Sequence, residues 1–254
     1  MQSLPLSPSR NLVCVQVIQE RKAHIRRGFI VLTLVLAGAS AAAAAPSKDE
    51  AGRIRDAATV ITELRAAPDS GIPESIWDRA RCVAVMPGVK KAAFLVGGEY
   101  GKGVVSCRTS AGWSAPVFLS LQKGSFGAQI GAESTDVVLL VMNERGIDRL
   151  LQDKVTLGAD ASLAAGPVGR SGAAATDAQL TAEMLSYSRA RGLFAGIDLS
   201  GGVLRPDKSA NEGSYGHAVS DRDILRGKER IVTPPATRSL MSALNGGPAR
   251  SAAK

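Results

Sequence analysis

Residues 82–108 read CVAVMPGVKKAAFLVGGEYGKGVVSCR, and this stretch decides the fold class. Apolar runs alternate with glycine and proline, which is typical of short strands joined by tight turns. At its centre, GGEYGKG at 97–103 surrounds a lysine with glycines and raises the alternative of a phosphate-binding loop. That motif needs glycine five residues before the Gly-Lys pair and Ser or Thr after it, where this chain has Val96 and Gly103. We therefore interpret 97–103 as a hairpin connection whose glycines supply positive backbone angles.

The same strand-like pattern continues to about residue 206, with helical patterns before and among the strands. Between 51 and 64, apolar side chains recur at helical spacing behind a capping box formed by Ser47 and Glu50, and Pro68 and Gly71 are expected to end this helix. Shorter helical patterns follow near Pro73, at 144–152 and at 207–216. Glycines recur inside strand-like segments and indicate a strongly curved or closed sheet. The sequence thus predicts an α+β fold with a curved, mainly antiparallel β-sheet, barrel- or sandwich-like, flanked by a few helices.

The N-terminal segment has the three zones of a secretory signal peptide. Four basic residues lie between 21 and 27, an apolar run begins at Phe29, and small residues continue to Ala45. A membrane anchor helix is the alternative, since the apolar stretch of about 17 residues is at the lower limit for spanning. Ala39 stands where a lipobox would need cysteine, so no lipid anchor is expected. We expect a periplasmic or secreted protein after cleavage.

Three regions follow from these patterns. Residues 1–45 form the signal peptide, 46–218 form the folded domain, and 219–254 form a C-terminal extension. After about residue 231 the extension is rich in Pro, Ser, Ala and Gly, and we expect it to be largely disordered.

The charge balance gives no support for a nucleic-acid partner. The chain has 31 basic and 23 acidic residues, of which 1–45 holds five and one, so the remainder has 26 and 22. A net charge of +4 is small for a phosphate-binding surface. Cys82 and Cys107 remain after cleavage, either as a disulfide or as two separate buried thiols. Zinc is not expected, because these cysteines and the distant His217 do not make a ligand set.

No arrangement of residues indicates an enzyme. A Ser-His-Asp hydrolase would need His217 beside a nucleophile, and no G-x-S-x-G motif is present. SLQK at 120–123 matches S-x-x-K, but it lies in a strand-like run without the companion motifs. Glu133 and Asp136 are interpreted as turn residues rather than as an acid–base pair. We therefore predict a protein without catalytic residues, metal or cofactor.

Five segments of the chain together form a recognisable pattern. They are CVAVMPGVKKAAFLVGGEYGKGVVSCR, GWSAPVFLSL, GSFGAQIGAESTDVVLLVMNERG, LGADASLAAGPVGR and YSRARGLFAGIDLSGGVL. In this order they resemble the SYLF domain family, over about residues 49–216. This resemblance implies lipid binding, since eukaryotic members bind phosphoinositides and some bind actin, while bacterial members are exported. Actin binding is not carried over to an exported chain, and the resemblance supplies no catalytic residues.

Five basic residues are candidates for contact with lipid. Lys90 and Lys91 precede one predicted strand, and Arg108 ends its hairpin partner, so these three are expected to converge. Lys102 is placed at the turn end of that hairpin, and Lys123 in another turn. The predicted function is an exported, non-enzymatic module that binds anionic phospholipid or the envelope surface. The alternative is a structural or protein-interaction module of the envelope.

Overall fold

A computed structural model of the chain describes residues 45–67, 71–94, 96–126, 131–169, 177–190, 193–217, 219–228 and 235–246. These ranges fall in the compact unit Ala44–Lys254. The predicted signal peptide lies outside the described residues except for Ala45, and it stays a prediction. No described helix is both long and apolar enough to cross a bilayer.

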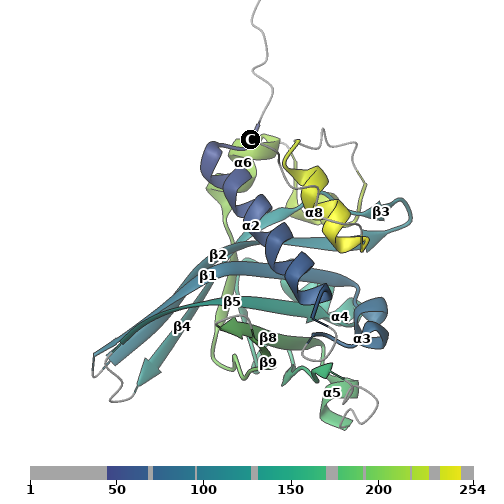
Figure 1. The fold of residues 1–254 in the computed structure, drawn as a ribbon. Helices are drawn as coiled ribbons and strands as arrows, with labels where there is room; N and C mark the ends of the chain where they lie inside the picture. The colour runs from purple at the N-terminus through teal and green to yellow at the C-terminus, as the bar shows by residue number, and fades with distance from the viewer. Residues whose placement is uncertain are drawn as a thin grey trace, which may run out of the picture. The chain divides into compact units, whose positions relative to one another are not determined.

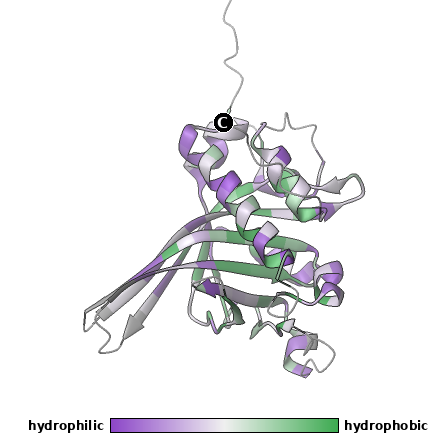
Figure 2. Cartoon of the chain, viewed as in Figure 1, coloured by the Kyte–Doolittle hydropathy of each residue, from purple (hydrophilic) through white to green (hydrophobic). Residues whose placement is uncertain are grey.

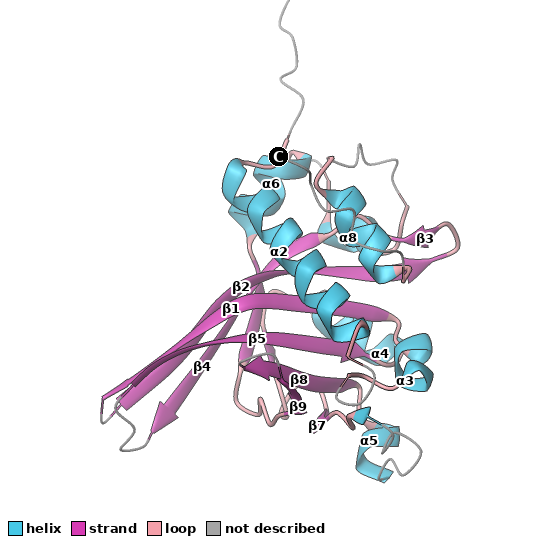
Figure 3. Ribbon diagram, in the orientation of Figure 1, coloured by secondary structure: helices cyan, strands magenta, loops and turns pink. Residues whose placement is uncertain are grey.

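A curled, mainly antiparallel sheet forms the centre of this unit (Figures 1 and 3). Its described strands run in the order β6-β10-β4-β2-β1-β5-β8-β7, with β3 on β2 and β9 on β8, and only β7–β8 is parallel. The predicted α+β fold is confirmed. The strands are β1 Cys82–Phe94, β2 Val96–Thr109, β3 Gly112–Trp113, β4 Val117–Phe126, β5 Gly131–Val141, β6 Val155–Thr156, β7 Leu163–Ala165, β8 Met184–Ala190, β9 Leu193–Gly196 and β10 Val203–Pro206.

Helices flank the sheet, and the predicted ones are present. The capping box at the start of the first described helix is confirmed, because the Ser47 hydroxyl accepts from Glu50 and the Glu50 carboxylate accepts from the Ser47 amide. The described helices are α2 Lys48–Arg65, α3 Glu74–Arg79, α4 Glu144–Leu150, α5 Asp177–Thr181, α6 Lys208–Tyr215, α7 Asp221–Leu225 and α8 Thr237–Leu244.

The hairpin connection predicted at 97–103 is wrong. These residues lie inside β2, which is one continuous strand, and the chain reverses near the Phe94–Val96 pair instead. The glycines serve close approach rather than a turn: a Cβ on Gly103 would lie 2.0 Å from the Val85 carbonyl oxygen, and one on Gly101 would lie 2.6 Å from Val89. Residues 97–103 are therefore neither a turn nor a phosphate-binding loop.

A β-bulge in β1 faces these glycines. The register between β1 and β2 shifts between Val85 and Lys90, and Gly88 within the shift has φ 59°. A bulge adds residues to one strand and bends it, so it changes which face the following side chains occupy. This shift sets the positions of Lys90 and Lys91.

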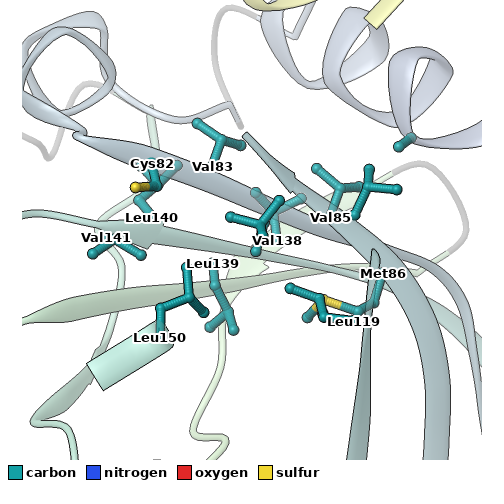
Figure 4. Close-up of a cluster of buried hydrophobic side chains, with 14 of the residues drawn as sticks. Cys82, Val83, Val85, Met86, Leu119, Val138, Leu139, Leu140, Val141 and Leu150 are labelled. Atoms are coloured by element: carbon teal, nitrogen blue, oxygen red, sulfur yellow. The ribbon is translucent and has the colours of Figure 1, made fainter. Parts of the chain in front are cut away.

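The core occupies both faces of the central strands. Alternation along β1 puts Val83 and Val85 on one side, whereas Leu119, Leu139 and Leu150 lie on the other (Figure 4). On the first side α2 packs across the sheet with Ile54, Ile61 and Leu64 buried. Figure 2 shows the hydrophobic residues concentrated where the helices lie over the strands.

Four strands continue beyond the helices as an arm (Figure 1). Strand β10 pairs with β4 only from Leu119 to Gln122, and β8 pairs with β5 only from Asp136 to Val141. The outer ends of β4, β2, β1 and β5 therefore pair only with one another within the described ranges. We call these ends (123–126, 96–99, 91–94 and 131–135) the arm.

The expected disorder of 219–254 is wrong for 219–228 and 235–246. The content of Pro, Ser, Ala and Gly masked a helical period in this segment. Leu240, Ala243 and Leu244 are buried on one side of α8, which packs against α2. Burial of this apolar side supplies the stabilisation that local composition did not reveal.

We expect Leu240→Ala to lower the free energy of unfolding by about 2 kcal/mol, because it truncates a buried side chain of α8, the helix that packs against α2. Arg238→Ala, at an exposed position of the same helix, should have little effect. Chemical denaturation of both variants measures this difference. Equal stabilities would show that α8 contributes nothing to the fold.

Candidate functional site

The predicted convergence of Lys90, Lys91 and Arg108 is wrong. Lys90 pairs in register with Tyr100, whereas Cys82 pairs with Cys107 at the other end of β1. Eight strand residues separate these ends by roughly 25 Å. Because the reversal is near Phe94, Arg108 lies far from both lysines, and Lys102 and Lys123 lie in strands rather than in turns.

Lys91 and Lys123 belong to a cross-strand row of alternating charge at the base of the arm. In register across β5, β1, β2 and β4 lie Glu133, Lys91, Glu99 and Lys123. The Lys91 ammonium is 3.8 Å from the Glu99 carboxylate, and the Lys123 ammonium donates to the Asp198 carbonyl at 2.9 Å. Opposite charges on facing positions stabilise a sheet modestly. Two lysines and two carboxylates leave this row without net charge.

Lys90 lies on the opposite sheet face, on the side covered by α2. Its register partner Tyr100 is 46% exposed, and Lys102 lies two residues further along β2 on the same face. Lys102 pairs in register with Ser120 of β4, and Ser120 pairs with Arg205 of β10. All these cations are exposed. We call Lys90, Tyr100, Lys102 and Arg205 the basic face. It lies beside α2, where the sheet continues into the arm.

Asp207 is the acidic residue that partly offsets the basic face. Its carboxylate accepts from the Lys102 ammonium at 2.9 Å, from the Arg53 guanidinium at 3.0 Å, and from the Ser209 hydroxyl at 3.1 Å. Desolvation alone would raise the pKa of Asp207, but these hydrogen bonds outweigh it and the pKa lies below its usual value. Two cations share one carboxylate, so this cluster remains positive.

The Arg108 side chain is held by contacts within the fold. Its guanidinium donates to the Ala80 carbonyl at 3.0 Å and to the Trp77 carbonyl at 3.4 Å, and it stacks 4.4 Å from the centre of the Trp113 ring. The carbonyls at the end of α3 are favourable partners for a cation. Arg108 thus anchors α3 to β2.

Cys82 and Cys107 face each other in register and form a disulfide with an S–S distance of 2.03 Å. The bridge joins β1 to β2 at the end away from the arm. Both residues are buried.

Neither the Ser-His-Asp arrangement considered from the sequence nor a metal cluster is found among the described residues. The His217 side chain is 85% exposed and contacts Glu212, so it does not lie in a pocket beside a nucleophile. No cluster of three or more His, Cys, Asp or Glu able to hold a metal occurs among the described residues.

Two hollows adjoin the helices. An apolar cavity of about 80 Å³ lies under α4 and α7, and burial raises the pKa of Asp221 at its rim. A wider, polar hollow of about 320 Å³ lies beside α2 and includes Gly88, Asp136 and Arg189. Asp136 and Glu63 both pair with Arg189, so this guanidinium is already neutralised. Neither hollow brings together the predicted lipid-binding lysines.

Comparison with known proteins shows the family of this chain. The family model described as "Ysc84: Las17-binding protein actin regulator" matches residues 122–246. The chain belongs to the Ysc84 (SYLF) family. The match extends through α8, in agreement with the packed C-terminal helix.

Curated relatives of the family come from fungi and vertebrates. "Protein YSC84" of Saccharomyces cerevisiae is 34% identical over 180 residues, covering 69% of this chain and 38% of the relative. "SH3 domain-containing YSC84-like protein 1" of Mus musculus is 33% identical over 202 residues, covering 78% and 58%. The chain thus spans about two fifths of the fungal relative and somewhat over half of the mouse one. The family description names a Las17-binding actin regulator, and a second relative from Saccharomyces cerevisiae has the name "LAS seventeen-binding protein 3".

Sequence reasoning missed Tyr100, Arg205 and Asp207. The signal for Tyr100 was present: taking 96–109 as one strand puts Tyr100 and Lys102 on one face by alternation. Arg205 and Asp207 reach Lys102 only through the pairing of β10 with β4, which no local pattern reveals.

Proposed function

We propose that this SYLF-family chain is an exported, non-enzymatic module that binds anionic phospholipid surfaces through its basic face. The observation that carries the proposal is the grouping of Lys90, Lys102 and Arg205 with exposed Tyr100 on the sheet face beside α2. Tyrosine beside cations is typical of surfaces at the membrane–water interface. The family resemblance to lipid-binding proteins supports the same assignment.

Binding through this face is expected to be weak and salt-sensitive. A basic residue near an anionic surface contributes about 1 kcal/mol. Three would contribute roughly 3 kcal/mol, reduced by Asp207, which is short of stable attachment. Surface attraction is screened over about 8 Å at physiological salt. The protein should therefore leave anionic vesicles as salt rises.

Export is part of the proposal and is supported by two observations. The N-terminal segment has the pattern of a secretory signal, and Cys82 and Cys107 are positioned as a disulfide, which persists in oxidising compartments. The proposed location is the periplasm or the outside of the cell.

Lys90 and Lys91 offer a matched test, since they are adjacent in sequence and lie on opposite faces. We expect Lys90→Gln to weaken binding to anionic vesicles about fivefold, in line with the loss of about 1 kcal/mol. Lys91→Gln removes the same charge from the neutral row and should weaken binding much less. Flotation of residues 46–254 with phosphatidylglycerol-containing and purely zwitterionic vesicles measures both. This piece includes all the described residues except Ala45, and it omits the apolar run that begins at Phe29.

Asp207→Asn is expected to change vesicle binding in the opposite direction. It frees Lys102 and Arg53 from their shared carboxylate, so binding to anionic vesicles should increase while circular dichroism shows the fold retained. Equal binding by wild type, Lys90→Gln and Asp207→Asn at low salt would rule out the basic face.

A protein-interaction module is the second candidate, favoured by relatives whose names describe Las17 binding. Absence of any vesicle binding by the wild type would favour this function. Its partner would be an envelope protein if the chain is exported.

A further inference from the structure

The outer end of the arm combines four strand ends without a single charge. Its described residues are 92–94, 96–98, 124–126 and 131–132, and these eleven positions contain only Ala, Gly, Phe, Ser and Val. Among them Phe94 pairs with Val96, and Val96 pairs with Phe126, so one apolar row crosses three strands. We call this row the tip row.

Charge returns abruptly behind the tip row. The next charged positions inward are Glu133, Lys91, Glu99 and Lys123, followed on the other face by Lys90 beside Tyr100. Three strand residues separate Lys91 from Phe94, which is about 10 Å along the strand. The arm thus changes from an uncharged end to a charged belt within the thickness of the polar region of one lipid leaflet.

The tip row is continuous with the basic face. No register shift separates the Val96–Phe126 pair from the Tyr100–Gln122 pair, so alternation puts positions 96 and 126 on the same sheet face as Tyr100. A surface that meets the basic face therefore also meets the tip row.

We propose that the tip row enters the interface of the bilayer to which the basic face binds, and so supplies the apolar part of membrane attachment. This inference rests on the proposed function and names the element that inserts. The occupant is the headgroup and upper acyl region of an anionic leaflet. Cations next to a tyrosine and an uncharged end match the order of groups in that region, with charges at the phosphates and apolar residues below.

The open edges of the arm set the depth of insertion. Within the described ranges, β4 at 123–126 and β5 at 131–135 each lack a strand on the outer side. Unpaired backbone groups are too costly in hydrocarbon, where water cannot satisfy them. The tip row therefore stays within roughly 10 Å of the surface, and the belt of charge stops further entry.

A fluorescence experiment tests insertion without changing an apolar residue. An environment-sensitive dye is attached at Ser125→Cys on the arm, or at Ser110→Cys in the turn at the opposite end of β2. The protein used is residues 46–254, which lacks Cys14 and has Cys82 and Cys107 bridged. With phosphatidylglycerol vesicles, Ser125→Cys should show a blue shift and quenching by a lipid-attached quencher, and Ser110→Cys should show neither. Equal responses at the two positions would overturn the inference.

Substitution of the tip row supplies the second measurement. Phe126→Asp and Val96→Asp should each lower the vesicle partition coefficient at least tenfold. They should also remove the part of binding that survives 0.5 M salt, where the Debye length is roughly 4 Å and surface attraction is largely screened. Ser110→Asp adds the same charge away from the tip and should keep the binding of wild type. Thermal melts identify any variant that has lost its fold, in which case the labelled proteins decide.

The outcomes separate this inference from the proposed function. If wild type binds no vesicles, the proposed function fails and the inference fails with it. If wild type binds in a Lys90-dependent manner but Phe126→Asp binds equally and the label at 125 is unchanged, only the insertion of the tip row is wrong.

Discussion

Gly103→Ala is expected to lower the free energy of unfolding by about 3 kcal/mol, the upper end of the usual cost of overpacking. The added Cβ would lie 2.0 Å from the Val85 carbonyl oxygen and 2.8 Å from the Met86 Cα. These are backbone atoms at the start of the bulge, so no side-chain rotation relieves the clash and β1 has to move away from β2. Urea denaturation followed by circular dichroism measures the loss.

Gly124→Ala is the matched control for this substitution. Gly124 is also a strand glycine of the sheet, but a Cβ there meets nothing within 4 Å. Its stability should stay within about 0.5 kcal/mol of wild type. If both variants were equally stable, the close approach of β2 to the bulge would not hold in solution.

Replacement of both bridged cysteines is expected to have an effect of similar size. The bridge spans a sequence separation of 25 residues, and the chain-entropy relation gives roughly 3.5 kcal/mol for a loop of that length. Cys82→Ala with Cys107→Ala keeps both sites apolar, which suits their burial. Urea denaturation of the oxidised wild type and of this double variant should differ by that amount.

Reduction and thiol labelling complete this test. Wild type treated with dithiothreitol should unfold at the urea concentration of the double variant, because both lack the cross-link. Protein recovered after export and then denatured should show no thiol reactive toward maleimide from Cys82 or Cys107. Two reactive thiols per chain would show that the bridge does not form in the cell.

Local signals in the sequence were enough for much of the secondary structure. A capping box and helical spacing predicted α2, because caps and i, i+4 neighbours lie within one segment. The strand content of 82–141 and the helix at Glu144 followed from short-range patterns in the same way. The curled antiparallel sheet and the family could also be inferred before the structure.

The candidate site could not be predicted from such signals. Glycine is common both in turns and where strands approach closely, so the glycines of 97–103 were compatible with either. The turn interpretation divided β2 into two strands and therefore predicted wrong positions for Lys102 and Arg108. Only the pairing of β2 with the bulged β1 shows which use applies. In the same way, α8 is stabilised by contact with α2, a helix more than 170 positions earlier in the chain.

The sequence by itself determined the local conformations, the class of fold and the absence of recognisable catalytic motifs. The tertiary structure alone decided that Lys90 lies on the basic face while Lys91 lies in the neutral row, and that Arg205 and Asp207 lie near Lys102. The physical reason is that a bulge changes the alternation of a strand, and strand pairing joins positions more than 80 residues apart. Both depend on neighbours in space that no local stretch of sequence encodes.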